Sequence, residues 1–155
     1  METPGEALQV ALKDSEFYQQ LFSQYRLQTF KKWPFDPKSA KAKTKHKCTS
    51  DLLAKVGYVH DSDCSAYCVF CGKTLEFESE DDPAEEHKAH SPNCVFLNLM
   101  ETPEENWTMD DIKPLLSALL LQKATEKLRT IRDELNNQIS KAEKRISPYI
   151  DIENQ

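Results

Sequence analysis

The sequence predicts an α+β fold, in which short helices around a three-stranded antiparallel sheet are followed by one long C-terminal α-helix. Three observations support this class. Residues 57–77 contain three short runs rich in β-branched and aromatic residues, as strands do. Apolar residues recur every three or four positions from 121 to 146, as in an amphipathic helix. Three of the five cysteines and one histidine lie within residues 68–94, at a spacing suited to a metal ion.

Length and composition exclude several classes of protein. A chain of 155 residues suits one domain, or one small domain with an extension. Only 3 residues are glycine, so neither a turn-rich β-sandwich nor a glycine-loop nucleotide site is expected. The net charge of −6 is unevenly distributed, with +4 on residues 1–47, −10 on residues 48–107 and 0 on residues 108–155. The cysteine cluster therefore lies in a strongly acidic block.

Neither a membrane span nor a secretory leader is predicted. The longest apolar stretch, Leu115–Leu121, is interrupted by Ser117 and is far shorter than the ~18 residues that a span needs. The first residues lack the apolar core of a leader, so we expect a reducing intracellular compartment. Cysteines there bind metals more often than they form disulfides.

The predicted organisation has five parts. We expect an N-terminal segment over 1–15, a compact domain over 16–100, a linker over 101–108, a long amphipathic helix over 109–148 and a tail over 149–155.

The first third predicts a helix and a basic loop. Apolar residues at roughly helical spacing predict a weak amphipathic helix, namely Leu8, Leu12, Phe17, Leu21, Phe22 and Tyr25. A second helix start capped by Asp14 or Ser15 is the alternative within this stretch. Trp33-Pro34 ends the helical stretch, because the residue before a proline is pushed out of the α region. Residues 36–47 contain five lysines, which predicts a solvated loop, with direct contact to DNA or phosphate as the alternative.

Short elements follow in residues 49–92. A helix over 49–56 is capped by Thr49 or Ser50, and strands are expected at 57–60, 66–70 and 74–77. Asp82 followed by Pro83 starts a second helix, with an N-cap and a proline at its first position. Ser91-Pro92 stops that helix.

The last third predicts the long helix. Thr108 and Asp111 form a capping box, and Pro114 predicts a kink or a restart. The helix is expected to run to Ser147-Pro148, with one step that departs from a heptad like a stutter. Its apolar face predicts a partner-helix surface made of Leu121, Leu128, Ile131, Leu135, Ile139 and Ile146.

The metal site is the most informative constellation. Cys68 and Cys71 lie two residues apart, so both thiolates can face one ion from a tight turn. His87 lies on the short helix, and the proline break lets Cys94 fold back as the fourth ligand. Three thiolates and one imidazole form a soft, closed, tetrahedral set that selects zinc. We therefore expect one structural Zn²⁺ ion.

Other cysteine and histidine residues compete for this role. Cys64 lies three residues before the cysteine pair, and His90 lies one helical turn after His87. Both are weaker candidates because the set of four is complete without them. Cys48 is expected to pack in the core.

The sequence also resembles a known family, the baculovirus inhibitor-of-apoptosis repeat or BIR domain. The resemblance covers residues 18 to about 98 and rests on the order, spacing and flanks of these motifs: Arg26-Leu-Gln-Thr-Phe30, Trp33-Pro-Phe35, Cys48-Thr49, Gly57-Tyr58, Cys68-x-x-Cys71, Asp81-Asp-Pro83, Glu86-His87 and Cys94. One such domain followed by one long helix is similar to the survivin-like, single-BIR proteins. The resemblance therefore extends over nearly the whole chain.

This resemblance implies a function. Survivin-like proteins are non-enzymatic subunits of the chromosomal passenger complex, and their long helix bundles with helices of borealin and INCENP. Aurora B kinase is held through INCENP. Their BIR domain reads the N-terminus of a histone tail phosphorylated on its third residue, and they homodimerise outside the complex. The implied locations are the nucleus with the centromere, the spindle midzone and the cytoplasm, in mitosis and cytokinesis.

The resemblance also implies a peptide groove. The matching positions are Lys73, Leu75, Glu76, Phe77, Asp81 and His90. The resemblance implies that Lys73 matches the position that faces the phosphothreonine. It implies that Leu75, Glu76, Asp81 and His90 match the positions that hold the N-terminal alanine, whose ammonium suits the carboxylates. Many family members carry Gly-Trp where Phe77 stands, and the Cys-to-His gap is one residue shorter here. Phe77 is expected to replace part of the tryptophan wall.

Two other functions compete with the adaptor role. Family relatives bind caspases or peptides with a free N-terminal alanine, so an apoptosis inhibitor is the main alternative. An enzyme is the weaker one, because a RING-type ligase needs about eight ligands for two zinc ions, and this chain has one set of four. A nucleophile pair of Cys64 and His60 is the remaining catalytic arrangement, and we expect no enzymatic activity.

Overall fold

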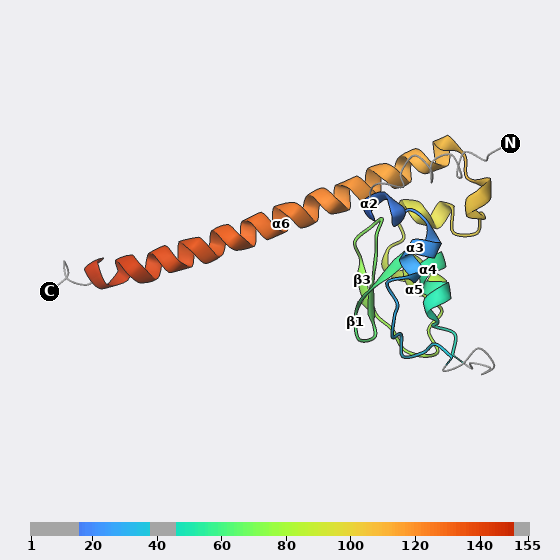
Figure 1. Cartoon of the computed structure of the whole chain (residues 1–155), viewed down its shortest axis with the longest axis horizontal. Coiled ribbons are helices and arrows are strands. Elements are labelled where there is room, and N and C mark those ends of the chain that lie inside the picture. Colours follow the sequence, from blue (N-terminus) through green and yellow to red (C-terminus); the bar gives the residue numbers. More distant parts are fainter. Residues whose placement is uncertain (1–15, 38–45, 151–155) are drawn as a thin grey trace. The chain divides into compact units, whose positions relative to one another are not determined.

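The computed structural model describes residues 16–37 and 46–150, and it confirms the predicted fold class (Figure 1). Three strands and short helices precede one long helix. The elements in chain order are α2 (Glu16–Gln19), α3 (Ser23–Leu27), α4 (Ser50–Lys55), β1 (Tyr58–Ser62), β2 (Ser65–Cys68), β3 (Thr74–Glu76), α5 (Pro83–His90), the 3₁₀ helices η1 (Val95–Asn98) and η2 (Glu104–Asn106), and α6 (Met109–Ile150).

Two predicted regions lie partly outside the described residues. They are the first part of the expected N-terminal helix, with Leu8 and Leu12, and residues 38–45 of the basic loop. Residues 151–155 of the predicted tail lie outside as well.

The sheet is antiparallel with strand order β1-β2-β3, so β3 is an edge strand. The prediction that the second strand reaches residue 70 was wrong. The strand ends at Cys68, where the chain turns and the Gly72 amide donates to the Cys68 carbonyl at 2.8 Å. Gly72 has φ +72°, a left-handed conformation that glycine adopts without a steric cost. This turn orients the two cysteines on either side of it.

The single N-terminal helix predicted across residues 17–25 was also wrong, because α2 and α3 are separate short helices. Leu21 and Phe22 lie between the two helices, and both side chains are buried. Phe22 is extended, and its ring stacks on Trp107. The carbonyls of Gln20 and Leu21 accept hydrogen bonds from the Arg26 guanidinium at 2.8 and 2.7 Å, so they are satisfied outside a helix.

Arg26 is a fully buried cation at the centre of the core. Its Nε donates to the Ala54 carbonyl at 2.8 Å, and its Nη2 lies 3.3 Å from Glu104 Oε1. The guanidinium also lies over the rings of Phe70 and Phe96, at 5.6 and 5.4 Å from their centroids. Burial lowers the pKa of Arg26 to about 10, against the opposing effect of Glu104, so the side chain remains charged at neutral pH.

The segment predicted as a linker, 101–108, belongs to the folded domain. Trp107 is buried, and its ring packs against Phe22 and Phe96. The first turns of α6 also contribute Ile112, Leu115 and Leu119 to the core. The first compact unit therefore ends at Gln122, and a second unit begins at Lys123.

Helix α6 begins at the predicted capping box. The Thr108 amide donates to Asp111 Oδ2 at 2.9 Å, and the Asp111 amide donates to Thr108 Oγ1 at 3.3 Å. The Thr108 hydroxyl also donates to Asp111 Oδ2 at 2.6 Å, and this hydrogen bond, together with that of the Thr108 amide, lowers the pKa of Asp111. The helix continues through Pro114, where only the Asp110 carbonyl, in the first turn, loses its donor. It also continues past Pro148 to Ile150, so the predicted stop was wrong.

In the part of the chain that the structure describes, no helix has an apolar stretch long enough to cross a bilayer.

A first prediction concerns the Arg26–Glu104 pair. Glu104→Ala removes the carboxylate that pairs with a buried guanidinium and accepts the Ser23 amide at 2.7 Å. We expect a loss of about 2 kcal/mol in the free energy of unfolding, below the full cost of breaking a buried pair because Glu104 is a quarter exposed. Urea unfolding measures this loss. The exposed neighbour provides the control, since Glu105→Ala should change stability by less than about 0.5 kcal/mol. Equal effects of the two substitutions would contradict the assignment.

Candidate metal centre and peptide groove

Four elements bring the predicted metal ligands together. Cys68 ends β2, Cys71 lies in the turn that follows, His87 is in α5 and Cys94 directly precedes η1. Their ligand atoms all lie within 4.8 Å of one another. Three of the side chains are buried and Cys71 is half-buried, so the site is closed to solvent on most sides. The predicted set of four is thus confirmed as a cluster.

The distances fit tetrahedral zinc. Cys68 Sγ and Cys94 Sγ are 3.9 Å apart, and Cys71 Sγ is 3.7 Å from His87 Nε2. Zinc bonds of ~2.3 Å to sulfur and ~2.0 Å to nitrogen, at tetrahedral angles, give separations of ~3.8 Å and ~3.6 Å. Four protein ligands leave no open position for water or substrate, so the site suits one structural zinc ion.

Hydrogen bonds around the cluster orient its ligands. His87 Nδ1 lies 2.9 Å from the Val56 carbonyl, which favours the tautomer whose Nε2 lone pair points at the cysteines. The Phe70 amide donates to Cys68 Sγ at 3.4 Å, a contact that stabilises a thiolate. Val56 directly follows α4, so the C-terminal end of that helix positions the ligand imidazole.

The electrostatics of the cluster favour a cation. Burial raises the pKa of the Cys68 thiol, whereas hydrogen bonds to Cys68 and Cys94 lower the pKa of the Cys71 thiol. Burial disfavours the charged form of His87, but its hydrogen bonds to Cys71 and Cys94 raise its pKa to about 9. These shifts favour a thiolate on the half-buried Cys71 beside a protonated His87, and a metal ion that binds here displaces the imidazole proton.

The turn between the cysteines contacts the start of the long helix. Gln122 Nε2 donates to the Phe70 carbonyl at 3.4 Å, and its amide lies directly against the Cα of Gly72. A side chain at position 72 would collide with Gln122 as well as adopt a strained φ. The sequence pattern gives no sign of this contact, because Gly72 and Gln122 lie far apart in the chain.

The competing ligands lie outside the cluster. His90 Nε2 is 3.3 Å from Glu86 Oε2, and Cys64 lies in the β1–β2 turn.

Cys48 is buried in the core as predicted, and burial raises the pKa of its thiol to about 12, which makes it inert. Within residues 16–37 and 46–150, no hydrogen bond joins Cys64 to His60, whose Nε2 lies 3.2 Å from the Asp63 carbonyl.

Most predicted groove residues lie at the surface. Lys73, Glu76 and His90 are exposed, and Leu75 and Asp81 are half-buried. Leu75 and Glu76 belong to edge strand β3, which pairs only with β2 among the described strands. One carboxylate oxygen of Asp81 accepts the Glu78 amide at 2.7 Å.

Phe77 corrects the prediction of a groove wall. The side chain is 2% exposed, and its ring packs edge-on against Tyr58 and Trp33, at 5.3 and 6.5 Å between centroids. It therefore offers no face to a ligand. The chain turns inward directly after β3, where the Phe77 amide donates to the Cys64 carbonyl. Phe77 is a core residue.

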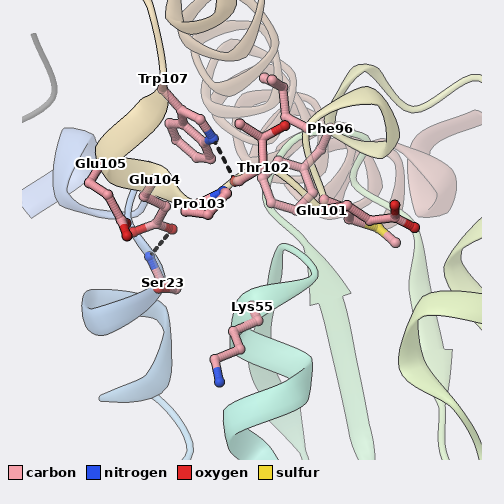
Figure 2. A pocket seen from close by; sticks show the side chains of 11 residues that line it. Ser23, Lys55, Phe96, Glu101, Thr102, Pro103, Glu104, Glu105 and Trp107 are labelled. Carbon is pink, nitrogen blue, oxygen red and sulfur yellow. Dashed lines mark hydrogen bonds between the residues drawn. The ribbon is translucent and has the colours of Figure 1, made fainter.

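A separate pocket of about 300 Å³ lies beside the predicted linker (Figure 2). Phe96, Leu99 and Met100 line it together with Lys55 of α4 and the carboxylates of Glu101, Glu104 and Glu105. The Ser23 amide donates to Glu104 on its wall, and Trp107 Nε1 donates to the Thr102 carbonyl. None of the predicted peptide-binding residues lines this pocket.

Comparisons with known proteins agree with this geometry. Residues 26–98 match the family model "BIR: Inhibitor of Apoptosis domain". The chain is similar to "Baculoviral IAP repeat-containing protein 5" of Mus musculus, at 38% identity over 95 residues, covering 58% of this chain and 63% of that protein. It is similar to "Baculoviral IAP repeat-containing protein 5.2" of Xenopus tropicalis, at 45% identity over 85 residues, covering 52% of this chain and 50% of that protein. The matched segments thus span less than two thirds of these relatives.

One solved structure is also similar to the chain. It is the autoinhibited dIAP1-BIR1 domain, with 32% sequence identity and a TM-score of 0.40, covering 49% of this chain and 72% of that one.

A second prediction tests the metal centre. Cys71→Ala removes one ligand, and because metal-binding energy is folding energy in a small site, we expect loss of bound zinc and of the cooperative melt of the first unit. Elemental analysis and near-ultraviolet circular dichroism measure both effects, and a strong chelator should reproduce them in the unmodified chain. The matched cysteine outside the cluster is the control, since Cys64→Ala should retain one zinc per chain. Thermal unfolding of the first unit that is unchanged by the chelator would refute the zinc assignment.

Proposed function

This chain belongs to the BIR family through residues 26–98, and from that premise we propose that it is a survivin-like, non-enzymatic adaptor of the chromosomal passenger complex. In this role the BIR domain reads the N-terminus of a phosphorylated histone tail. Helix α6 bundles with borealin-like and INCENP-like helices, and Aurora B kinase is brought to its sites through the INCENP-like partner. The chain then acts at the centromere and spindle midzone during mitosis and cytokinesis.

The observation that carries this proposal is the apolar face of α6. The six residues predicted for a partner-helix surface, Leu121 to Ile146, are 48–67% exposed. Helices in proteins derive most of their stability from packing an apolar face, so a face of this length calls for a covering partner. A bundle with two further helices would bury it. A homodimer outside the complex remains the second expectation for the same chain.

The surface of the BIR domain supports tail reading. Edge strand β3 leaves one row of backbone groups available for an added strand, the mode in which extended peptides bind a sheet. Glu76 and Asp81 supply carboxylates for an N-terminal ammonium, and exposed Lys73 supplies a cation for a phosphate. The charge of −10 on residues 48–107 complements a basic histone tail.

Contact with DNA through the lysine-rich segment 36–47 stays a prediction. Most of its lysines lie in residues 38–45, outside the described residues.

A third prediction tests tail reading. Calorimetric titration of the full chain should show micromolar binding of a histone-tail peptide with phosphothreonine at position three, and weaker binding of the unphosphorylated peptide. Lys73→Ala should lower this preference by at least about tenfold, because one charge-assisted hydrogen bond contributes about 1.5–3 kcal/mol. Lys88→Ala, a lysine of α5 paired with Glu85, is the control and should keep the preference.

Other outcomes of the titration identify other functions. Tighter binding of an Ala-Val-Pro-Ile peptide would favour the apoptosis inhibitor over the tail reader. Binding of none of these peptides would refute the reading role of the groove and leave α6 as the functional element.

A fourth prediction tests helix bundling. Leu128→Glu places a charge in the middle of the apolar face and should abolish assembly with borealin-like and INCENP-like helices. The zinc content and melt of the first unit should not change, because Leu128 lies in the second unit. Sedimentation of the mixed helices with the chain measures assembly. Ser140→Glu, on the far side of the helix, should leave it intact. Assembly that survives Leu128→Glu would contradict the assigned face.

A further inference from the structure

The apolar face of α6 repeats every eleven residues. Three pairs of residues have this spacing: Leu128 with Ile139, Ile131 with Ala142, and Leu135 with Ile146. An eleven-residue period is about 3.67 residues per turn, so the face stays almost in line along a straight helix. All six side chains are exposed. The stripe, defined here as these six residues, therefore presents a straight docking surface ~27 Å long.

The edges of the stripe are mainly basic. At about 100° per residue, Lys127, Arg132 and Arg145 lie within about 80° of its centre, and Glu143 is the only acidic residue as close. Arg132 has an exposed partner in Asp133. Lys127 and Arg145 form no ion pair among the residues that the structure describes. Across 123–149 seven residues are basic and four are acidic.

The charges at these edges disfavour the binding of a second copy of this chain to the stripe. In a parallel pair, Arg132 of one helix faces Lys127 of the other. In an antiparallel pair Lys127 faces Arg145 at both ends of the stripe, and Arg132 lies near Glu143, so this arrangement combines like and opposite charges. Like charges at such edge positions select against self-pairing, as they do in coiled coils. Opposite charges at the same positions add affinity and fix the partner.

We propose that the stripe binds a different chain, an amphipathic helix with an eleven-residue apolar repeat whose edges carry glutamate or aspartate opposite Lys127, Arg132 and Arg145. This inference rests on the proposed function only in taking the stripe as a helix-docking surface. It adds the partner's charge and its repeat, and it assigns the stripe to a heteromeric contact.

Two synthetic helices test the charge. Both carry the same eleven-residue apolar repeat, and one has glutamate and the other lysine at the edge positions. Titrated into the full chain by calorimetry, the glutamate helix should bind at least ~10-fold more tightly at low salt. Its advantage should shrink as ionic strength rises, because the edge charges are exposed and screened.

Reversing the charge of two edge residues tests the same assignment from the side of this chain. The double variant Lys127→Glu/Arg145→Glu should prefer the lysine helix, since its edges now carry the opposite sign. The control is Lys144→Glu, which makes the same charge change opposite the stripe and should keep the original preference.

The outcomes separate this inference from the proposed function. Equal binding of the two helices would overturn the charge assignment and leave helix docking intact. Binding of neither would overturn helix docking itself. Self-association of the chain that Leu128→Glu abolishes would assign the stripe to a second copy and overturn the inference.

Discussion

The domain depends on the convergence of three thiols and one imidazole within a few ångströms. One ion fixes the relative positions of four segments, because each of them supplies one ligand. They are β2 with Cys68, the turn after it with Cys71, α5 with His87 and the residue before η1, Cys94. Crowded buried thiolates repel one another without a cation, and the core around them is small. The turn at Gly72, the cap of α5 and the hydrogen bond from His87 to the Val56 carbonyl all serve this geometry.

The buried guanidinium of Arg26 connects the metal centre to the rest of the first compact unit. Phe70 lies between the first two cysteine ligands, and its ring packs on Phe96 and under the Arg26 guanidinium. Arg26 in turn holds the chain before α3, the end of α4 and Glu104. The metal turn, the N-terminal helices and the segment that leads into α6 therefore share one set of contacts.

The two compact units offer two kinds of surface. The first combines an open strand edge, β3, with exposed carboxylates and one lysine, which suits a short extended peptide with a charged end. The second is a helix whose stripe gains stability only when another helix covers it. The adaptor role that we propose needs this division, because one surface would recognise a site and the other would hold the assembly that acts there.

Local patterns in the sequence determined the metal ligands, the helix caps and the apolar repeat of α6, because each is marked by particular residue types at characteristic spacings along the chain. The caps at Asp82 and Thr108 and the four ligands follow from spacing alone. The burial of Phe77, the division of the first helix and the inclusion of residues 101–122 in the domain were decided by tertiary structure. Arg26 pairs with a carboxylate 78 residues away, and Phe77 packs on Trp33. No local periodicity encodes such contacts, since they form only when the core brings distant segments together.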